Sequence, residues 1–297
     1  MASMKLSRLG LGIVLGLILG CAGETQDLGG WRVAFEDEPR GRIGVCDLAG
    51  KGLEYITPDS LWATGPVSDT LGRTVYFMAG KPEDSLVPNA IYAVETDGSY
   101  LRKLTDLPLR AADIQVTPDG GKIVFIGRYA DQEYMRAYEY VVGTEGFRAV
   151  SVAGRPAYDP GMAPGGLNFV WHDSSMTDTL FVSSLQQVLT LPIFPFPYTQ
   201  CAISPDGEAF AAVCGENRRG LCFNKLREKA ERVLVPESDA GAITRPIFHP
   251  DGERVAFVYT EFAEGATPEI RMVSLNSLEV NKIPIDAVAP THPAWVR

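Results

Sequence analysis

One short motif recurs along this chain at a nearly constant spacing. The clearest copy runs from Thr244 to Tyr259 (TRPIFHPDGERVAFVY), and close counterparts begin at Ala112 and Thr199. Weaker copies begin at Thr64 and Tyr158, so that successive starts lie 41 to 48 residues apart. A fixed period of this length is typical of repeat architectures, in which each repeat forms one supersecondary unit. We therefore expect the chain to consist of one structural unit repeated several times.

Each unit has the pattern of a four-stranded antiparallel sheet. An apolar segment precedes Pro-Asp-Gly, whose residues favour a tight turn. An alternating, β-branched and aromatic segment follows, such as Lys122–Ile126, and third and fourth segments follow it, such as Ile91–Val94 and Leu101–Thr105. No window shows a capped helical period. Four strands at this spacing indicate the blade of a β-propeller.

The last copy of the motif is split between the two ends of the chain. It begins at Thr291, stops after one strand at Arg297, and continues in sequence pattern at Trp31. We therefore predict an all-β fold: a six-bladed β-propeller of four-stranded blades over residues 31–297. The ring would be closed by pairing of the N- and C-terminal strands, which removes two exposed sheet edges.

The motif resembles the WD-like repeat of the TolB-type β-propellers. The match is clearest at Thr117–Gly120, Ser204–Gly207 and His249–Gly252, and it extends over residues 31–297. The resemblance implies a propeller that binds protein or peptide segments at the mouth of its central channel. TolB-like proteins carry an additional N-terminal α/β domain for which this sequence shows no counterpart. Two copies, at Asp69–Gly72 and Ala163–Gly166, have lost the full turn.

The first residues have the pattern of a signal peptide. Lys5 and Arg8 precede an apolar run, Leu9–Leu19, which is shorter than the roughly 20 residues that span a bilayer. We expect residues 1–20 to be a signal peptide.

The segment that follows this apolar run predicts a lipid anchor. Ile18–Cys21 resembles the bacterial lipobox, which implies lipidation of Cys21 and leaves residues 21–30 as a short linker. Ala22 after the cysteine resembles the pattern that directs lipoproteins to the outer membrane, facing the periplasm. An ordinary signal peptide followed by a chance cysteine is the alternative.

Composition argues against nucleic acid as a partner. The formal net charge is −10, and no long basic run is present to neutralise phosphates. We therefore expect the partner to be an envelope protein or peptide, with the membrane contacted through the lipid anchor.

The remaining cysteines fit an oxidising compartment. Their spacing is not a zinc pattern. Cys214 and Cys222 fall on the two strands of one predicted hairpin, which makes them candidates for a disulfide. Cys201 is the competing partner, and Cys46 should remain unpaired.

A polar residue recurs at the start of the first strand of each repeat. In most copies it lies seven positions before the glycine of the turn, in a strand that is otherwise apolar, and Gly65 takes the place in one copy. In a propeller this strand lines the central channel, so these residues form a candidate binding ring at its mouth. The polar members are Asp113, Asp159, Gln200, Arg245 and His292. A channel mouth that is simply wet is the alternative interpretation.

No pattern of residues predicts catalysis. The three histidines fall at different places in the repeats, so they should not converge on one metal ion, and no Gly-x-Ser-x-Gly elbow with a hydrolase domain is present. We therefore expect a binding scaffold without a metal or cofactor, and not an enzyme. Two alternatives remain: a propeller enzyme acting on envelope glycan or peptide, and a structural subunit of an envelope complex.

Overall fold

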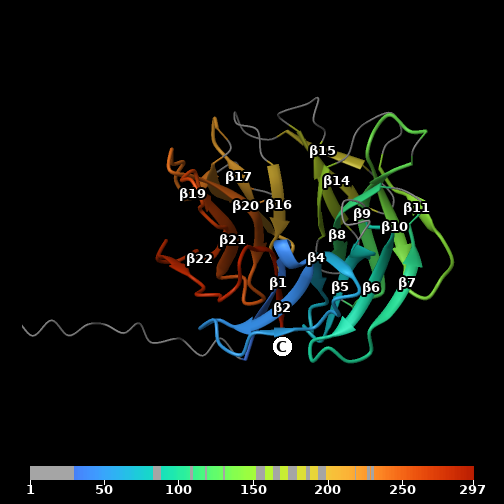
Figure 1. The fold of residues 1–297 in the computed structure, drawn as a ribbon. Coiled ribbons are helices and arrows are strands. Elements are labelled where there is room, and N and C mark those ends of the chain that lie inside the picture. The colour runs from blue at the N-terminus through green and yellow to red at the C-terminus, as the bar shows by residue number, and fades with distance from the viewer. Residues whose placement is uncertain are drawn as a thin grey trace, which may run out of the picture.

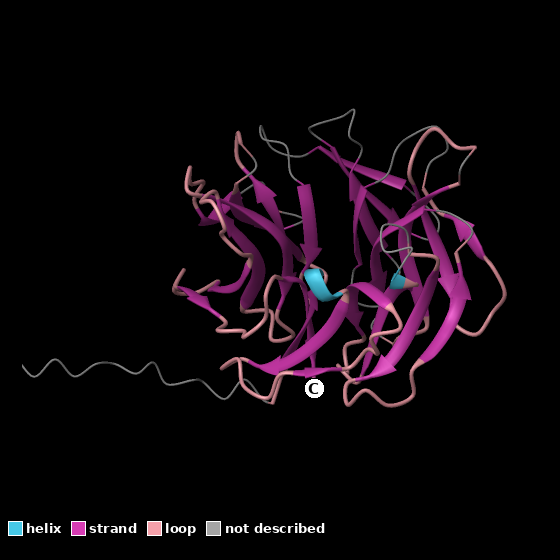
Figure 2. Cartoon of the chain, viewed as in Figure 1, coloured by secondary structure: helices cyan, strands magenta, loops and turns pink. Residues whose placement is uncertain are grey.

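The computed structural model describes a chain made almost entirely of strands (Figure 2). Residues 158–162, 168–172, 179–184 and 188–192 and residue 199 are described without their side chains. No helix in the described ranges is long and apolar enough to cross a membrane. The predicted signal peptide, Cys21 and most of the predicted linker lie outside these ranges. The described residues are 30–82, 88–107, 110–117, 119–129, 131–151, 158–162, 168–172, 179–184, 188–192, 199–217, 219–225, 228 and 231–297.

The strands form four-stranded antiparallel sheets that follow one another around a ring (Figure 1). The first sheet combines β24 (Pro290–Val296) with β1 (Arg32–Asp37), β2 (Arg42–Asp47) and β3 (Glu54–Tyr55). A short helix, η1 (Glu38–Arg40), joins β1 to β2. The next sheets are β4 (Trp62–Ser68), β5 (Thr74–Gly80), β6 (Ala90–Glu95) and β7 (Arg102–Asp106), and then β8 (Arg110–Val116), β9 (Lys122–Arg128), β10 (Arg136–Val141) and β11 (Phe147–Ala149).

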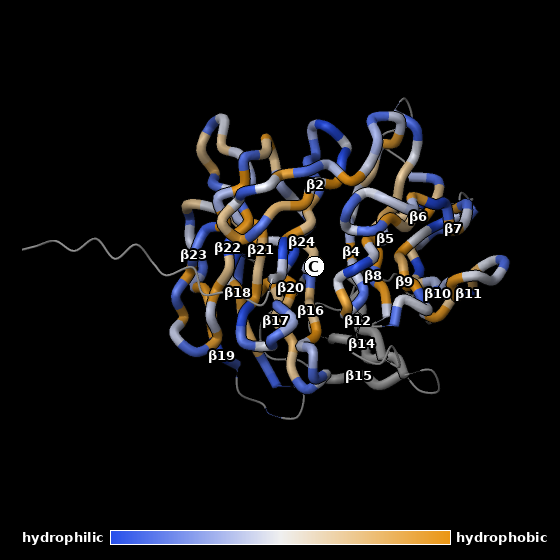
Figure 3. Tube along the Cα trace, turned by 90° about the horizontal axis from the view of Figure 1, so that it is seen from below, coloured by the Kyte–Doolittle hydropathy of each residue, from blue (hydrophilic) through white to orange (hydrophobic). Residues whose placement is uncertain are grey.

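Three further sheets complete the ring. They are β12 (Tyr158–Met162), β13 (Asn168–His172), β14 (Thr179–Ser184) and β15 (Val188–Pro192); β16 (Thr199–Ile203), β17 (Ala209–Cys214), β18 (Gly220–Lys225) and β19 (Glu231–Val235); and β20 (Gly241–Phe248), β21 (Arg254–Glu261), β22 (Glu269–Ser274) and β23 (Val280–Lys282). The first strands contact one another in the order β24, β4, β8, β12, β16, β20 and back to β24, so that they surround a central channel. Seen from below, the sheets lie around a centre near which the C-terminus is found (Figure 3).

The predicted count of six blades needs a correction. The structure describes five blades in full, as strands with side chains, whereas the sheet β12–β15 is described only by its strands and their pairing. The prediction of a six-bladed propeller was therefore wrong in its number of blades.

The repeated turn explains why the motif recurs. In the turn between β8 and β9, the hydroxyl of Thr117 donates to Oδ1 of Asp119, which also accepts the N–H of Gly121 at 2.9 Å. Gly120 adopts a left-handed conformation (φ +69°), which a residue without Cβ takes at little cost. Ser204 and Asp206 repeat the same contacts between β16 and β17. Each motif thus encodes one hairpin between the first two strands of a sheet.

The middle strands are buried on both faces because neighbouring sheets pack against each other. In β5 the residues from Val75 to Gly80 are all buried. One apolar cluster joins the first two sheets and includes Val45, Phe77 and Val94. Strands at the outer edge are exposed instead, as in β7. Continuous apolar runs in middle strands are expected for sheets covered on both sides.

The two ends of the chain meet in one sheet, as the split motif predicts. β24 pairs antiparallel with β1, and Val33 lies opposite Trp295. The N–H of Arg297 donates to the carbonyl of Gly72 at 2.7 Å, which ties the last residue to the neighbouring sheet. This closure fixes the positions of the first strands around the channel.

Candidate functional site at the channel mouth

The first strands enclose a cavity of about 790 Å³ along the channel. Its wall is apolar in the middle, with side chains such as Val67, Ile114 and Ile247. Gly65, Asp113, Gln200, Arg245 and His292 line one end of the cavity, and we call these five residues the channel mouth. The structure thus brings together the predicted ring residues whose side chains it describes. Asp159 lies on β12, and its side chain is outside the described part.

The mouth residues share an unusual backbone conformation. All five have positive φ: +62° at Gly65, +47° at Asp113, +48° at Gln200, +52° at Arg245 and +47° at His292. A non-glycine residue in this left-handed region is uncommon, and it costs roughly 1–2 kcal/mol. Strain of this kind persists only where the surrounding structure enforces it, and it is concentrated at functional sites.

A β-bulge at each of these residues produces the conformation. The register between the first and second strands shifts at the mouth in every sheet with a described mouth residue, for example between Ala112 and Ile114 and between Thr244 and Ile247. A bulge re-aims the side chain of the extra residue. The bulges place these side chains on the cavity wall, which the sequence alignment alone did not reveal.

An ion pair spans the channel at the mouth. Nη1 of Arg245, on β20, donates to Oδ1 of Asp113, on β8. Two first strands separate β8 from β20 in either direction around the ring, so this pair joins opposite sides of the channel. The backbone N–H of Arg245 also donates to Oε1 of Gln200 at 2.6 Å, which ties β20 to β16.

A second polar network at the mouth centres on Glu36, which the sequence analysis did not identify. Its side chain is only 6% exposed, and its Oε2 lies 3.0 Å from Nδ1 of His292. The same oxygen accepts the hydroxyl of Thr64 at 2.7 Å and the N–H of Gly65 at 3.0 Å. A carboxylate directly after the apolar run Val33–Phe35 was the available signal, because a buried charge requires partners.

The environment of Glu36 keeps it ionised. Burial by itself raises the pKa of this carboxyl group, but the hydrogen bond and charge of His292, together with the donors from Gly65 and Thr64, outweigh burial and lower the pKa below its ordinary value. The mouth therefore holds a fixed negative charge that positions His292.

The other end of the cavity lies beside the turns. Trp31, His249 and Arg297 line it. The guanidinium of Arg297 lies 4.5 Å from the ring of Trp31, and His249 lies edge-on to Trp295 with ring centroids 4.5 Å apart. Burial lowers the pKa of His249, against the opposing effect of the Asp251 carboxylate. These residues pack the β20–β21 turn against the closing strand.

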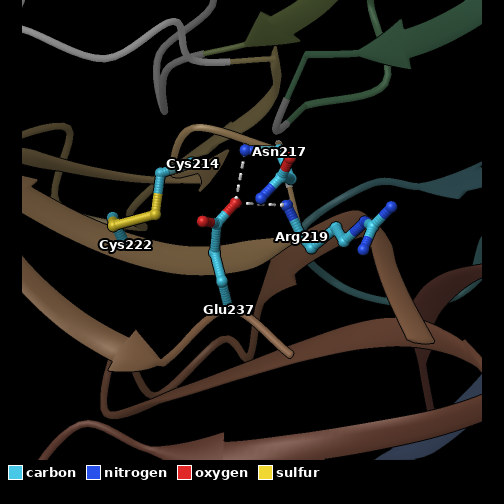
Figure 4. Close-up of a disulfide and its surroundings, with 5 residues drawn as sticks. All are labelled: Cys214, Asn217, Arg219, Cys222 and Glu237. Carbon is cyan, nitrogen blue, oxygen red and sulfur yellow. Dashed lines mark hydrogen bonds between the residues drawn. A yellow bond between two sulfur atoms is a disulfide. The ribbon is translucent and has the colours of Figure 1, made fainter. Parts of the chain in front are cut away.

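A disulfide joins Cys214 on β17 and Cys222 on β18 (Figure 4). The two residues are diagonal neighbours on β17 and β18, not directly opposite, because Cys214 pairs with Gly220. Oε1 of Glu237 accepts the N–H groups of Asn217 and Arg219, at 2.8 and 3.3 Å, and so fixes the loop between the two strands (Figure 4).

The other cysteines lie where their positions in the repeats predict. Cys201 lies in the same side-chain cluster as the disulfide. Cys46 is a buried free thiol in the first sheet, and burial raises its pKa to about 12. Among the described residues, no group of three or more His, Cys, Asp or Glu side chains is arranged to hold a metal ion.

Comparison with known proteins supports the fold. No family model matches this sequence, and no curated protein sequence is significantly similar to it. TolB from Acinetobacter baumannii superposes with a TM-score of 0.72 at 15% identity, over 90% of this chain and 66% of that chain. The fold is a β-propeller similar to that of TolB.

Two other solved structures show the same architecture. A chain of the nidogen/laminin complex has a TM-score of 0.70 at 12% identity, covering 90% of this chain and 99% of that chain. A TolB candidate from Agrobacterium tumefaciens has a TM-score of 0.64 at 12% identity, covering 85% and 88%. At such identities, likeness to the TolB-type propellers concerns the fold alone.

Proposed function

We propose that this protein is a membrane-anchored lipoprotein whose propeller binds a segment of an envelope protein or peptide at the channel mouth. One observation carries the proposal: five aligned residues adopt the same left-handed conformation, which is strained at the four that are not glycine, and all of them line one cavity. Regular strands would avoid this cost, so the strain points to a role for the mouth.

The size and wall of the cavity suit a peptide segment. About 790 Å³ falls within the range of ordinary ligand pockets, which combine an apolar wall with a few polar groups that set orientation. Most of the polar groups here lie at the mouth and at the turns at the other end, and Gln115 of β8 also lines the wall. TolB-type relatives and the nidogen/laminin complex have the same fold, which is compatible with a scaffold that binds protein.

The anchor and location are part of the same proposal. Lipidation of Cys21 would hold the propeller at the outer membrane on the periplasmic side, within reach of about 30 Å through a nine-residue linker. Cys21→Ser should abolish acylation. Unchanged labelling by a palmitate analogue would refute the anchor without affecting the proposal for the mouth.

Affinity capture from crosslinked envelopes tests the binding role. We expect the wild-type protein to retain a stoichiometric protein partner. Turnover of envelope glycan or peptide by the purified propeller, with no partner retained, would instead support an enzyme.

A further inference from the structure

The two charged pairs at the mouth differ in how firmly they are held. Glu36 is buried and accepts from Thr64 and Gly65 as well as facing His292. Arg245 and Asp113 are more accessible, with side-chain exposures of 33% and 19%. A partly exposed pair contributes roughly 0–1 kcal/mol, so a competing group can exchange with it.

The exchangeable pair also stands in the way of any segment that enters from this end. Because Arg245 and Asp113 join opposite sides of the channel, an occupant of the cavity must pass or displace their contact. The peptide N–H of Arg245 is held by the Gln200 side chain, so the Arg245 backbone is fixed whichever group its guanidinium contacts.

The chemistry of Arg245 and Asp113 indicates whether a bound segment would replace the carboxylate or the guanidinium of this pair. A guanidinium has five N–H donors in a planar fork that matches a carboxylate, and Asp113 contacts Nη1. An incoming carboxylate can bind in bidentate fashion, which is stronger than a single contact. A cation that replaced Arg245 on Asp113 would gain no additional bidentate contact.

We propose that the occupant of the mouth presents a carboxylate that takes the place of Asp113 on Arg245, and that Asp113 acts as an intramolecular competitor for this site. This inference rests on the proposed function, because it names the chemical class of the segment bound there. A peptide C-terminus and an Asp or Glu side chain supply the same chemistry.

Binding of defined peptide pools tests the inference. Four pools of seven-residue peptides built from uncharged residues would be used: one with a free C-terminal carboxylate, and three amidated pools with a single Glu, Gln or Lys. Binding would be measured by fluorescence anisotropy on folded wild type, Asp113→Asn and Arg245→Gln. Asn keeps the left-handed backbone accessible at position 113. Arg271→Gln is the matched control, since Arg271 is also ion-paired but lies on β22 away from the mouth.

The expected result is binding of the free-carboxylate or the Glu pool, and the pool that binds identifies the source. Asp113→Asn should tighten this binding about three- to tenfold, Arg245→Gln should weaken it at least tenfold, and Arg271→Gln should leave it unchanged. Binding of the Gln pool as tight as that of the better carboxylate pool, or preference for the Lys pool, overturns the carboxylate while leaving a mouth that binds peptide. No binding of any pool by any variant overturns the proposed peptide site itself.

Discussion

Nδ1 of His292, on the last strand of the chain (β24), lies 3.0 Å from Oε2 of Glu36, on β1. The two strands belong to one sheet, so this contact joins the closure of the ring to the channel mouth. Glu36 also reaches the neighbouring sheet through Thr64 and Gly65. The position of His292 at the mouth therefore depends on how the two ends of the chain are joined.

This relationship predicts an acid-sensitive step in stability. The pKa of folded Glu36 is lowered from its ordinary value of 4.5, so its contribution is present above about pH 4.5 and is lost as the pH falls through the lower folded pKa. Glu36→Gln should cost about 1–3 kcal/mol at pH 7, because it removes a charged acceptor from buried donors. Chemical denaturation between pH 7 and 3 measures both effects. Parallel stability curves for the variant and the wild type would contradict the assignment.

His249 predicts a second pH dependence at a higher pH. Burial lowers its folded pKa below the ordinary 6.5, so the unfolded chain binds a proton that the folded protein does not. Stability should therefore be complete above about pH 6.5 and should decline as the pH falls from there toward the folded pKa.

His249→Ser is the matched variant, because Ser204 occupies the same place in another turn. It should unfold about 1–3 kcal/mol more easily at pH 8, since it removes a ring packed against Trp295, yet it should lack the wild-type decline just below pH 6.5. A variant that keeps the full decline would locate the titrating group elsewhere.

The closing strand should be essential to the fold. Deletion of Thr291–Arg297 removes β24 from its pairing with β1 and exposes the buried neighbours of Trp295 and Val296. Truncating one buried tryptophan alone costs about 3–5 kcal/mol, so loss of the whole strand should abolish cooperative melting or lower the melting temperature by more than 10 °C, about the shift expected for several kcal/mol. A melting temperature within a degree or two of the full chain would refute the shared sheet.

The disulfide predicts a defined loss of stability. Replacing both Cys214 and Cys222 by Ser opens a loop with a sequence separation of 8 residues, which should cost about 2–3 kcal/mol. Non-reducing peptide mapping should recover the 214–222 pair from the oxidised protein. Recovery of a link from Cys201 to either residue would show that the competing arrangement forms in its place.

The hairpins and the closure of the ring could be predicted because they depend on local sequence. Pro-Asp-Gly with a preceding Ser or Thr specifies its turn through contacts within six residues, as in Thr117–Lys122. The column containing Asp113 and Arg245 could be found by aligning the copies. Its left-handed backbone could not, because it follows from a shift in the hairpin register that the alignment does not show. Its cross-channel ion pair could not, because it joins residues 132 positions apart that meet only when the ring forms.

Other features escaped prediction for similar reasons. Glu36 lies outside the aligned column, and its role depends on Thr64 and Gly65 from the next sheet. The diagonal placement of Cys214 and Cys222 follows from the hairpin register, which a loop without turn chemistry does not specify. The number of blades was also wrong, because the structure describes five blades in full and not six.

The most direct test of binding at the mouth compares Arg245→Ala with Arg271→Ala. Both arginines belong to the same sheet and are ion-paired at similar exposure, but only Arg245 lines the cavity. Capture from crosslinked envelopes should retain at least tenfold less partner with Arg245→Ala, about 1.4 kcal/mol, while Arg271→Ala should match the wild type and both should melt normally. Equal capture by folded Arg245→Ala and wild type would contradict binding at the mouth.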